Sequence, residues 1–476
     1  MKNQRLLLAF ALIGTFVVSP PLRAAAPAKK NVLFIVSDDL NNSLGCYGNP
    51  VVKSPNIDRL ATKGMRFDRA YCNYPVCNPS RVSFLSGIRP DETKIIDLTT
   101  PTRTYLKDWV FLPEYFRHQG YRTLKVGKIY HTGRGMEDPR SWDEDFIEPP
   151  YGKPTETDPA HIVRKQGPDG IVIRAQDEDT WEGFVARKTV ALIEEAVRSG
   201  KPFFAAAGFR RPHRPYVAPE KYFALYHPDE LLPRLGPPEH LAAIPDEALT
   251  YKIGINPRFP TERPGDTIAA YYASISFMDA QVGVLLDALD RLDLWKNTVV
   301  VFISDHGYHL GEHGGLWHKL SLFDEGTRVP LIVASPEYKP GVSERLVELV
   351  DLYPTLTDLC GLATPAGLEG TSFKPVLDVP DRPWKRAIFT VVSRPHPGES
   401  GDFGDLTTMG RTVFDGRWRY TEWPQGGVEL YDHHSDPLEY QNLAADPAHR
   451  RQLEAMKALL ASGWKAGLPT STGDGP

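Results

Sequence analysis

The sequence has few cysteines, no long apolar run beyond its start and no basic tail. Four of its 476 residues are cysteine, so disulfide bonds are not what builds this fold. No stretch after the N-terminus is long and apolar enough to cross a membrane, and we expect no stable membrane insertion. Lys and Arg form no tail or stripe, which argues against nucleic acid as a partner. Internal repeats are absent as well.

What is present is an ordinary globular composition, with 41% hydrophobic and 24% charged residues. The length suffices for one large core and a smaller module. The net charge is −5, and it becomes about −8 without the first 26 residues, which carry three basic residues and no acid. Mild acidity does not exclude an anionic substrate, because local Lys and Arg set the field in a pocket.

The first 26 residues have the order of a secretory signal peptide. Lys2 and Arg5 precede an apolar run over residues 6–18, and small alanines follow at 24–26. We therefore expect a soluble mature chain that is exported, either to the periplasm or out of the cell. An uncleaved N-terminal anchor is the alternative.

Apolar runs alternate with helical segments along most of the chain, and this order predicts an α/β domain with a mostly parallel sheet. Strands are expected at residues 31–36, 121–126, 203–207, 298–303 and 329–334. Helices are expected at residues 54–63, 112–119, 181–199, 266–292 and 347–359. Two loop-rich segments, 138–177 and 209–264, are expected to form pocket walls.

The pattern changes after about residue 371. The C-terminal elements expected are short antiparallel strands at 387–392, 411–414 and 417–422, and a helix at 453–464. The chain is accordingly divided into a signal peptide (1–26), a large α/β domain (27–370), a C-terminal subdomain (371–468) and a disordered tail (469–476).

Polar residues follow the two strongest strands at their carboxyl ends, where parallel sheets place their sites. Asp38 and Asp39 end the first, and Asp305 and His306 end the strand at 298–303. Adjacent carboxylates repel each other unless a cation lies between them. Three carboxylates and one nitrogen do not resemble tetrahedral zinc. We expect Ca²⁺, with Mg²⁺ as the alternative; a solvated loop or helix cap is the plainer interpretation of the first pair alone.

Cys77 lies in the pentapeptide Cys77-Asn78-Pro79-Ser80-Arg81. Pro79 suits the first turn of a helix, so Cys77 is expected at or just before a helix N-terminus, which favours an anion. Arg81, about one turn on, offers a planar fork for oxyanions. A lone cysteine is more often a buried or redox residue. Neither role explains why a proline and an arginine follow it at these fixed positions.

Four further cationic or imidazole side chains are candidates for the same site. Lys128 and His131 follow the strand at 121–126 and lie three positions apart along the chain. His213 lies between two prolines, which stiffen its loop, and imidazole suits proton transfer near neutral pH. Lys319 follows a segment rich in glycine and histidine. Each of them alone is more often structural or solvated.

The assembled pattern resembles the type I sulfatase family, and within it the iduronate-2-sulfatase branch. The segments that carry the resemblance are 36–40, 44–48, 54–58, 77–87, 126–128, 211–213, 304–307 and 310–314. Many members of the family have Asn at the position of His306, whereas the iduronate-2-sulfatase branch has His there. One residue is inserted around Gly315, and residues 138–177 diverge, so the substrate stays open.

The resemblance implies an alkaline-phosphatase-like fold, with a large mixed, mostly parallel sheet between helices and a smaller C-terminal α+β subdomain. It implies that a formylglycine-generating or sulfatase-maturing enzyme oxidises Cys77 to formylglycine, whose hydrate attacks sulfur. Asp38, Asp39, Asp305 and His306 then hold the metal together with modified Cys77.

The resemblance also implies roles for the remaining candidates. Arg81 stabilises the hydrate, Lys128 contacts sulfate, and His131 is the base that releases it. His213 and Lys319 face the leaving alcohol, with His213 as the preferred proton donor. Side chains proposed to choose the sugar are Arg210, Arg211, Arg214, Tyr308, His309 and Trp317, since cationic and aromatic groups suit anionic sugars.

Three functions are compared. The first is hydrolysis of sulfate from a sulfated sugar or polysaccharide. The second is a phosphonate or phosphate monoester hydrolase of the same superfamily, which would require more positive charge or a second metal. The third is an inactive glycan-binding protein, which the complete set of catalytic residue types disfavours.

Overall fold

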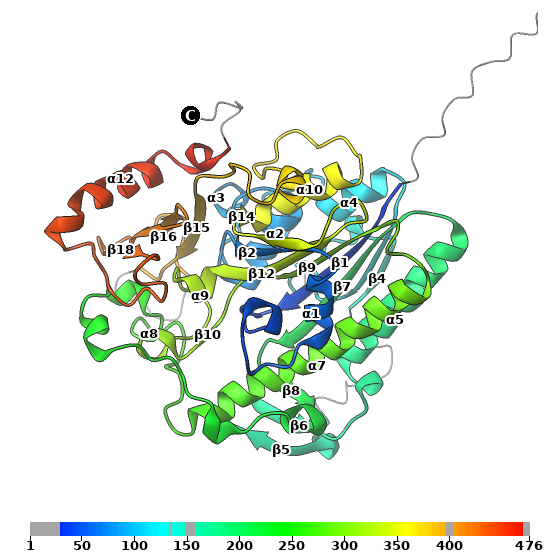
Figure 1. Cartoon of the computed structure of the whole chain (residues 1–476), viewed down its shortest axis with the longest axis horizontal. Helices are drawn as coiled ribbons and strands as arrows, with labels where there is room; N and C mark the ends of the chain where they lie inside the picture. Colours follow the sequence, from blue (N-terminus) through cyan, green and yellow to red (C-terminus); the bar gives the residue numbers. More distant parts are fainter. Residues whose placement is uncertain (1–28, 134, 148–157, 397–402, 470–476) are drawn as a thin grey trace, which may run out of the picture.

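The centre of the molecule is a large mixed sheet (Figure 1). The computed structural model describes residues 29–133, 135–147, 158–396 and 403–469. The strand order is β13-β2-β12-β9-β1-β7-β3-β4, and β14 also pairs with β2. The strands are β1 (Asn31–Asp38), β2 (Met65–Tyr71), β3 (Arg122–Gly127), β4 (Glu144–Phe146), β7 (Phe203–Pro212), β9 (Thr298–Ser304), β12 (Arg328–Ala334), β13 (Gly341–Ser343) and β14 (Val347–Glu348).

The sheet is mostly parallel, as the sequence predicts. β1 lies between β7 and β9 and runs parallel to both, and β3 and β4 continue the parallel run. β12 is antiparallel to β9 and β2. The five expected strands are all present. β2, which was not expected, completes the side of the sheet beyond β12.

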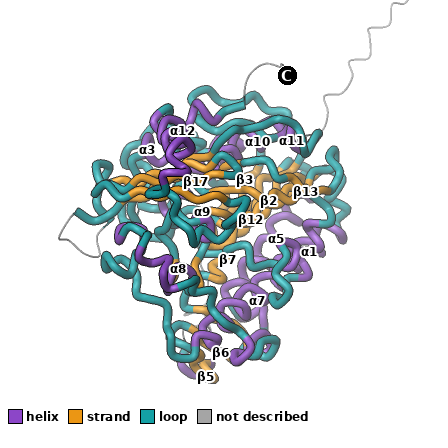
Figure 2. The backbone as a smooth tube through the Cα atoms, turned by 60° about the vertical axis from the view of Figure 1, so that its left-hand side comes forward, coloured by secondary structure: helices purple, strands orange, loops and turns teal. Residues whose placement is uncertain are grey.

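Helices cover both faces of the sheet (Figures 1 and 2). Alternate side chains of β1 point to opposite sides, as the two-residue period of a strand requires. Leu33 and Ile35 join one core cluster, whereas Val32, Phe34 and Val36 join the other. Helices of the first cluster are α1 (Pro55–Ala61), α5 (Trp181–Ser199) and α7 (Pro264–Arg291). Helices of the second are α2 (Cys77–Ser86), α4 (Leu112–His118) and α10 (Leu352–Leu359).

A separate antiparallel sheet lies toward the C-terminus, beside helix α12 (Figure 1). Its strands, in spatial order, are β15 (Ile388–Ser393), β16 (Met409–Phe414), β17 (Trp418–Glu422) and β18 (Val428–Asp432), and α12 covers Arg450–Ala461. Three of these strands and the helix are expected from the sequence, and β18 is not. Domain boundaries at 370 and 468 stay predictions.

The structure corrects the expected helix at 347–359. Val347 and Glu348 form β14 beside β2, a 3-10 turn covers Leu349–Asp351, and the α-helix begins only at Leu352. Val347 pairs with Ala70, so its apolar character serves a strand rather than a helix face.

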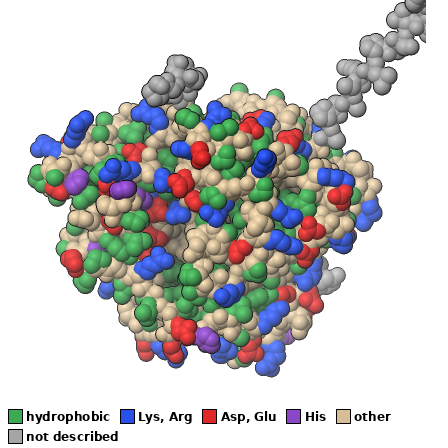
Figure 3. Space-filling model, in the orientation of Figure 1, with side chains coloured by type: hydrophobic (Ala, Val, Ile, Leu, Met, Phe, Trp, Pro, Cys, Tyr) green, Lys and Arg blue, Asp and Glu red, His purple; other side chains and the backbone are tan. Residues whose placement is uncertain are grey.

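The loop-rich segments hold more regular structure than expected. Residues 138–177 contribute β4, β5 (Ile162–Gln166) and β6 (Gly170–Ile173), and β6 pairs with β8 (Tyr216–Pro219) from the second segment. The expected signal peptide and nearly all of the expected tail lie outside the described residues. No described helix is long and apolar enough to cross a membrane. Figure 3 shows Lys and Arg interspersed with Asp and Glu over one face, without a broad patch of one sign.

A close backbone approach at Gly208 sets the path of the chain toward the site. A Cβ atom on Gly208 would lie 2.1 Å from the carbonyl oxygen of Lys128. A side chain at this position therefore pushes the ends of β7 and β3 apart.

We expect Gly208→Ala to destabilise the protein, because the backbone of Lys128 cannot move away from the added methyl group. The cost should be about 1–3 kcal/mol or more, as for other overpacked sites. Thermal unfolding measures it. Gly341→Ala is the matched control, since its Cβ would meet only the flexible Met65 side chain at 3.3 Å. Equal melting temperatures for the two variants would contradict this account.

Candidate active site

Two neighbouring parallel strands end at the same place. β1 and β9 pair in register as far as Ser37 and Ser304, so Asp38, Asp39 and Asp305 follow at one edge of the sheet. The amide of Asp305 donates to the carbonyl of Ser37 (3.2 Å), and the amide of Asp39 donates to Asp305 Oδ1 (3.2 Å). Asp39 has a φ of 64°, a conformation that residues other than glycine adopt rarely. The strand ends thus bring Asp305 to the adjacent carboxylates Asp38 and Asp39, which are distant from it in sequence.

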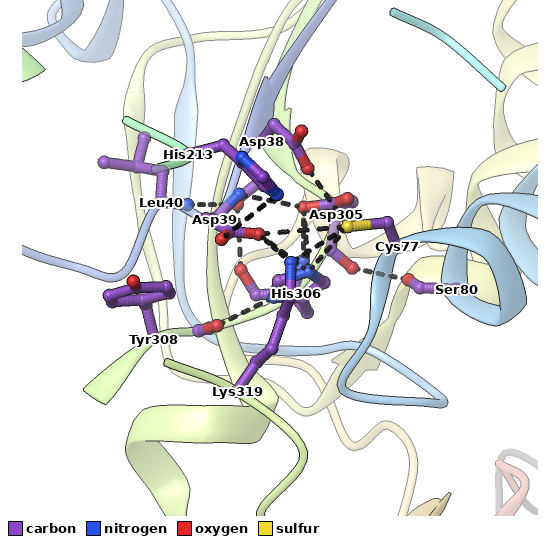
Figure 4. A network of polar contacts seen from close by, with 12 residues as sticks. Asp38, Asp39, Leu40, Cys77, Ser80, His213, Asp305, His306, Tyr308 and Lys319 are labelled. Carbon is purple, nitrogen blue, oxygen red and sulfur yellow. Dashed lines mark hydrogen bonds and ion pairs between the residues drawn. The ribbon is translucent and has the colours of Figure 1, made fainter. Parts of the chain in front are cut away.

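Cys77 is the first residue of α2, and its sulfur points into this group of carboxylates (Figure 4). Sγ lies 3.3 Å from Asp38 Oδ1, 3.5 Å from His306 Nε2 and 3.1 Å from Lys319 Nζ. Every residue of α2 is buried, which holds the helix N-terminus in place. The expectation that Cys77 begins a helix beside the acidic residues is confirmed.

Arg81 lies behind the sulfur and ties the elements together. Its Nε donates to Asp305 Oδ2 (2.8 Å), and one terminal nitrogen donates to the carbonyls of Lys128 (2.7 Å) and Ile129 (2.9 Å). The other terminal nitrogen forms an ion pair with Asp38 Oδ1 at 3.3 Å but makes no hydrogen bond within the described part of the chain. This fully buried guanidinium therefore keeps one donor free on the side of the carboxylates.

The donor atoms fit a divalent cation. The residues whose ligand atoms all lie within 4.8 Å of one another are Asp38, Cys77, Asp305 and His306. His306 donates from Nδ1 to the carbonyl of Gly307 (2.8 Å), so Nε2 is the ring nitrogen that faces the cluster and offers a lone pair once it loses its proton. Burial has the largest effect and lowers the pKa of His306, but Asp305, Asp39 and Cys77 together raise it, to about 10. A protonated His306 ring partly neutralises the negative charge of the surrounding carboxylates. A bound cation would neutralise the same charge.

Two amines contact the carboxylates. Lys128, from the end of β3, donates to Asp38 Oδ2, and Lys319 donates to Asp39 Oδ1 (2.6 Å). Burial lowers the pKa of Lys319, but Asp39, Cys77, Asp38 and Asp305 together raise it above its usual value. Asn256 donates to the backbone carbonyl of Lys319 (2.8 Å), which fixes the chain at this residue. Lys319 is therefore held as a cation at the site.

A pocket of about 260 Å³ opens over Cys77 and Asp39, and His131 and His213 line it. His213 Nε2 lies 3.9 Å from Asp39 Oδ2, and its Nδ1 donates to the carbonyl of Arg214 (2.6 Å). Burial lowers the pKa of His213 to about 4, although Asp39 opposes this. Burial and then Lys128 lower the pKa of His131 to about 3. Both rings are neutral near pH 7 when the pocket holds no anion.

The structure brings only part of the predicted sugar-contacting set to the pocket. Arg214 lines it. Arg211 is buried and donates to the carbonyl of His213, whereas Arg210 lies over the Trp181 ring, 3.6 Å from its centroid. These two arginines are placed to shape the loop.

Tyr308, His309 and Trp317 require a correction, because their side chains are buried away from the pocket lining. Tyr308 shares a hydrogen bond with the Tyr216 hydroxyl (2.7 Å), and Trp317 donates to the same hydroxyl (3.1 Å). His309 contacts Ser321 (2.5 Å). Strands β10 (His309–Leu310) and β11 (Trp317–His318) pair with each other, and this hairpin directs the three side chains into the protein.

Sequence reasoning missed two polar residues of the pocket lining, Asn256 and His318. His318 lies 3.9 Å from Asp169, which in turn lies 3.7 Å from Arg214. The only sequence signal for His318 is its position beside Lys319. Asn256 has no local signal, because it comes from the proline-rich segment and reaches Lys319 only in the folded chain.

Comparisons with known proteins agree with this geometry. The chain matches the family model described as Sulfatase over residues 30–362, and the one described as N-sulphoglucosamine sulphohydrolase, C-terminal, over residues 311–465. It is 33% identical to Iduronate 2-sulfatase of Homo sapiens, over 87% of this chain and 91% of that protein. It is 31% identical to Iduronate 2-sulfatase of Mus musculus, over 94% and 97%. The solved phosphonate monoester hydrolase of Agrobacterium radiobacter has a TM-score of 0.79 at 24% identity, over 91% of this chain and 95% of that one.

The sheet topology and the likeness to that solved structure define an alkaline-phosphatase-like fold, as expected from the sequence. Within that fold class the chain belongs to the sulfatase family, and it is a sulfuric ester hydrolase.

We expect Arg81→Lys to destabilise the protein, because a single ammonium cannot replace a fork that serves Asp305 and two backbone carbonyls. Each hydrogen bond to a charged group contributes about 1.5–3 kcal/mol, so the loss should be of that order. Urea unfolding measures it. Arg69→Lys is the control, since Arg69 is partly exposed and donates to a loop carbonyl. A midpoint for Arg81→Lys equal to that of the control would refute the anchoring role.

Proposed function

We propose that this protein removes sulfate from a sulfated sugar or polysaccharide, in the manner of its iduronate 2-sulfatase relatives. Cys77 would be converted to formylglycine, and Asp38, Asp39, Asp305 and His306 would hold Ca²⁺, or Mg²⁺ in its place. The observation that carries the proposal is the Cys77 side chain at a buried helix N-terminus, 3.3 Å from Asp38 and 3.1 Å from the Lys319 amine. The aldehyde hydrate would supply the nucleophile, and the cation would supply charge that polarises the sulfate.

The chain's own cations are placed to bind the sulfate group. Lys128 and Lys319 approach the carboxylates from two sides, and Arg81 keeps one donor free beside them. In a buried site such fixed charges act more strongly than in water, because little solvent reorganises around them. They orient the tetrahedral anion over Cys77 and stabilise negative charge on its oxygens as the ester bond breaks.

Proton transfer is assigned to the two pocket histidines. Lys319 keeps its proton, since Asp39 raises its pKa, and it therefore serves as a fixed charge rather than as the donor. A bound sulfate ester brings negative charge beside His213, which favours the protonated ring and makes it the donor to the leaving alcohol. His131 is neutral, and its Nδ1 has no hydrogen-bond partner, so it is placed to accept a proton when sulfate is released.

The pocket favours a single sugar residue. Its volume of about 260 Å³ is slightly below the usual range for small-ligand pockets. Arg214 and His318 are proposed to contact the acidic part of the sugar, while Leu98 and Ile255 form an apolar wall. We also propose export to the periplasm or out of the cell, with a maturing enzyme of the producing cell as the partner that modifies Cys77.

The mass of the peptide that contains Cys77 tests the nucleophile directly. We expect protein made in its own host to show the loss of mass for replacement of the thiol by an aldehyde. Cys77→Ala should abolish hydrolysis of sulfate esters and leave the circular dichroism spectrum unchanged. Cys46→Ala, a partly exposed cysteine outside the pocket, is the control that keeps activity. Retained sulfatase activity in Cys77→Ala, or preference of the wild type for aryl phosphonates over aryl sulfates, would overturn the proposal.

Leaving-group dependence tests the donor. We expect His213→Asn to lower kcat for a sulfated sugar by about 10²–10⁴-fold, as for loss of a general acid. The loss should be much smaller for nitrophenyl sulfate, whose phenolate departs without a proton. An equal loss on both substrates would show that His213 only positions the substrate.

A further inference from the structure

A second group of metal-ligating side chains lies outside the Cys77 site and shares no residue with it. Ligand atoms of His313, Glu325 and Glu439 all lie within 4.8 Å of one another. His313 belongs to α8 (Glu312–Gly315), Glu325 belongs to α9 (Asp324–Thr327), and Glu439 follows β18. Figures 1 and 2 show α8 and α9 on the side of the molecule that carries the C-terminal sheet. The group therefore joins the catalytic part of the chain to its C-terminal part.

The atoms that face one another in this group have unused bonding capacity. His313 is completely buried, and its Nε2 makes no hydrogen bond to any residue that the structure describes. It points toward Glu325 Oε2 at 3.5 Å, and that oxygen is also buried without a hydrogen bond among the described residues. Buried polar atoms are nearly always satisfied in native proteins, so two facing orphans require an explanation.

The His313 ring is held in the orientation of a ligand. It stacks on Phe323 with ring centroids 3.7 Å apart, and its Nδ1 lies 2.9 Å from His240 Nε2. With the proton on Nδ1, donated to His240, a lone pair remains on Nε2 and faces the carboxylates. Metal-binding histidines commonly donate their other ring nitrogen in this way.

Charge in the neighbourhood is not balanced. Arg419 pairs with Glu439 and with Asp324 (2.8 Å), and Arg328 lies 3.4 Å from Asp324. Glu325 and nearby Glu312 form ion pairs only with histidines in the part of the chain that the structure describes. Two carboxylates thus remain without a permanent cation.

We propose that His313, Glu325 and Glu439 bind a second divalent cation of the zinc class, with water in the remaining positions. Three protein ligands, one of them an imidazole nitrogen, and a fourth position for water match four-coordinate Zn²⁺ or Co²⁺, whereas the Cys77 site offers more ligands and suits a harder ion. A pocket of about 350 Å³, lined by Glu312, Asp324 and Glu325, supplies the entry path and the water.

The bound cation has a structural task. Residues 312–327 include Lys319, whose amine touches Cys77, and both ends of this segment supply a ligand. Glu439 fixes the same ion to the C-terminal sheet region. Occupancy would therefore hold the loop that carries Lys319 and stabilise the folded chain in proportion to the affinity.

Cobalt binding tests the site without reference to turnover. The full mature protein is stripped with chelator, saturated with Ca²⁺ to fill the catalytic position, and titrated with Co²⁺ while the visible absorption of the metal is recorded. We expect one further equivalent per chain and a rise in melting temperature. His313→Gln and Glu325→Gln should each weaken this binding by about tenfold or more, the scale of effects seen when metal-site residues are replaced.

Two matched variants make the result decisive. His449→Gln changes an exposed C-terminal histidine and should leave the cobalt titration unchanged. Asp305→Asn disrupts the proposed catalytic metal site and should keep the cobalt signal, which separates failure of one site from failure of the other. The proposal is overturned if folded wild-type protein takes up no further equivalent, which would mean that a proton shared by Glu325 and His313 satisfies both. It is equally overturned if the signal persists in both ligand variants.

Discussion

The pairing of buried carboxylates with buried cations at the ends of β1 and β9 is the constraint on which the site depends. Asp38, Asp39 and Asp305 would repel one another in a dry environment, and each is held by a cation. Arg81 forms ion pairs with both Asp305 and Asp38. Lys128 pairs with the other oxygen of Asp38, and Lys319 pairs with Asp39. Because Arg81 sits on α2, the same ion pairs that neutralise the acids also fix Cys77. The same ion pairs therefore determine both the geometry of the site and the stability of the core.

Much of the fold could be predicted from local pattern. Central strands such as β9 are continuous apolar runs, and parallel strands end at a common edge, so the meeting of Asp38 with Asp305 follows from topology alone. β2 was missed because Arg66, Asp68 and Arg69 interrupt its apolar residues. The partly exposed side chains of Arg66 and Asp68 form an ion pair with each other and do not pack in the core. The strand is recognised only once β12 and β13 lie beside it.

Site residues could be predicted where one short motif contains them. They could not be predicted where their position depends on how the chain turns back on itself in the fold. Cys77 and Arg81 lie one helical turn apart, so their relation is local. Tyr308, His309 and Trp317 looked equally suitable by residue type, but the β10–β11 hairpin turns them inward. The reverse holds for Asn256, an inconspicuous residue that tertiary structure alone brings to Lys319.

The burial of α2 has a consequence for the order of events during biosynthesis. Cys77 is only 1% exposed, and all ten residues of its helix are covered by the sheet and neighbouring helices. An enzyme that has to grip this stretch in extended form cannot reach it in the finished molecule. Any enzymatic change at the sulfur must then be made before the polypeptide folds, and collapse of the core afterwards buries the altered side chain.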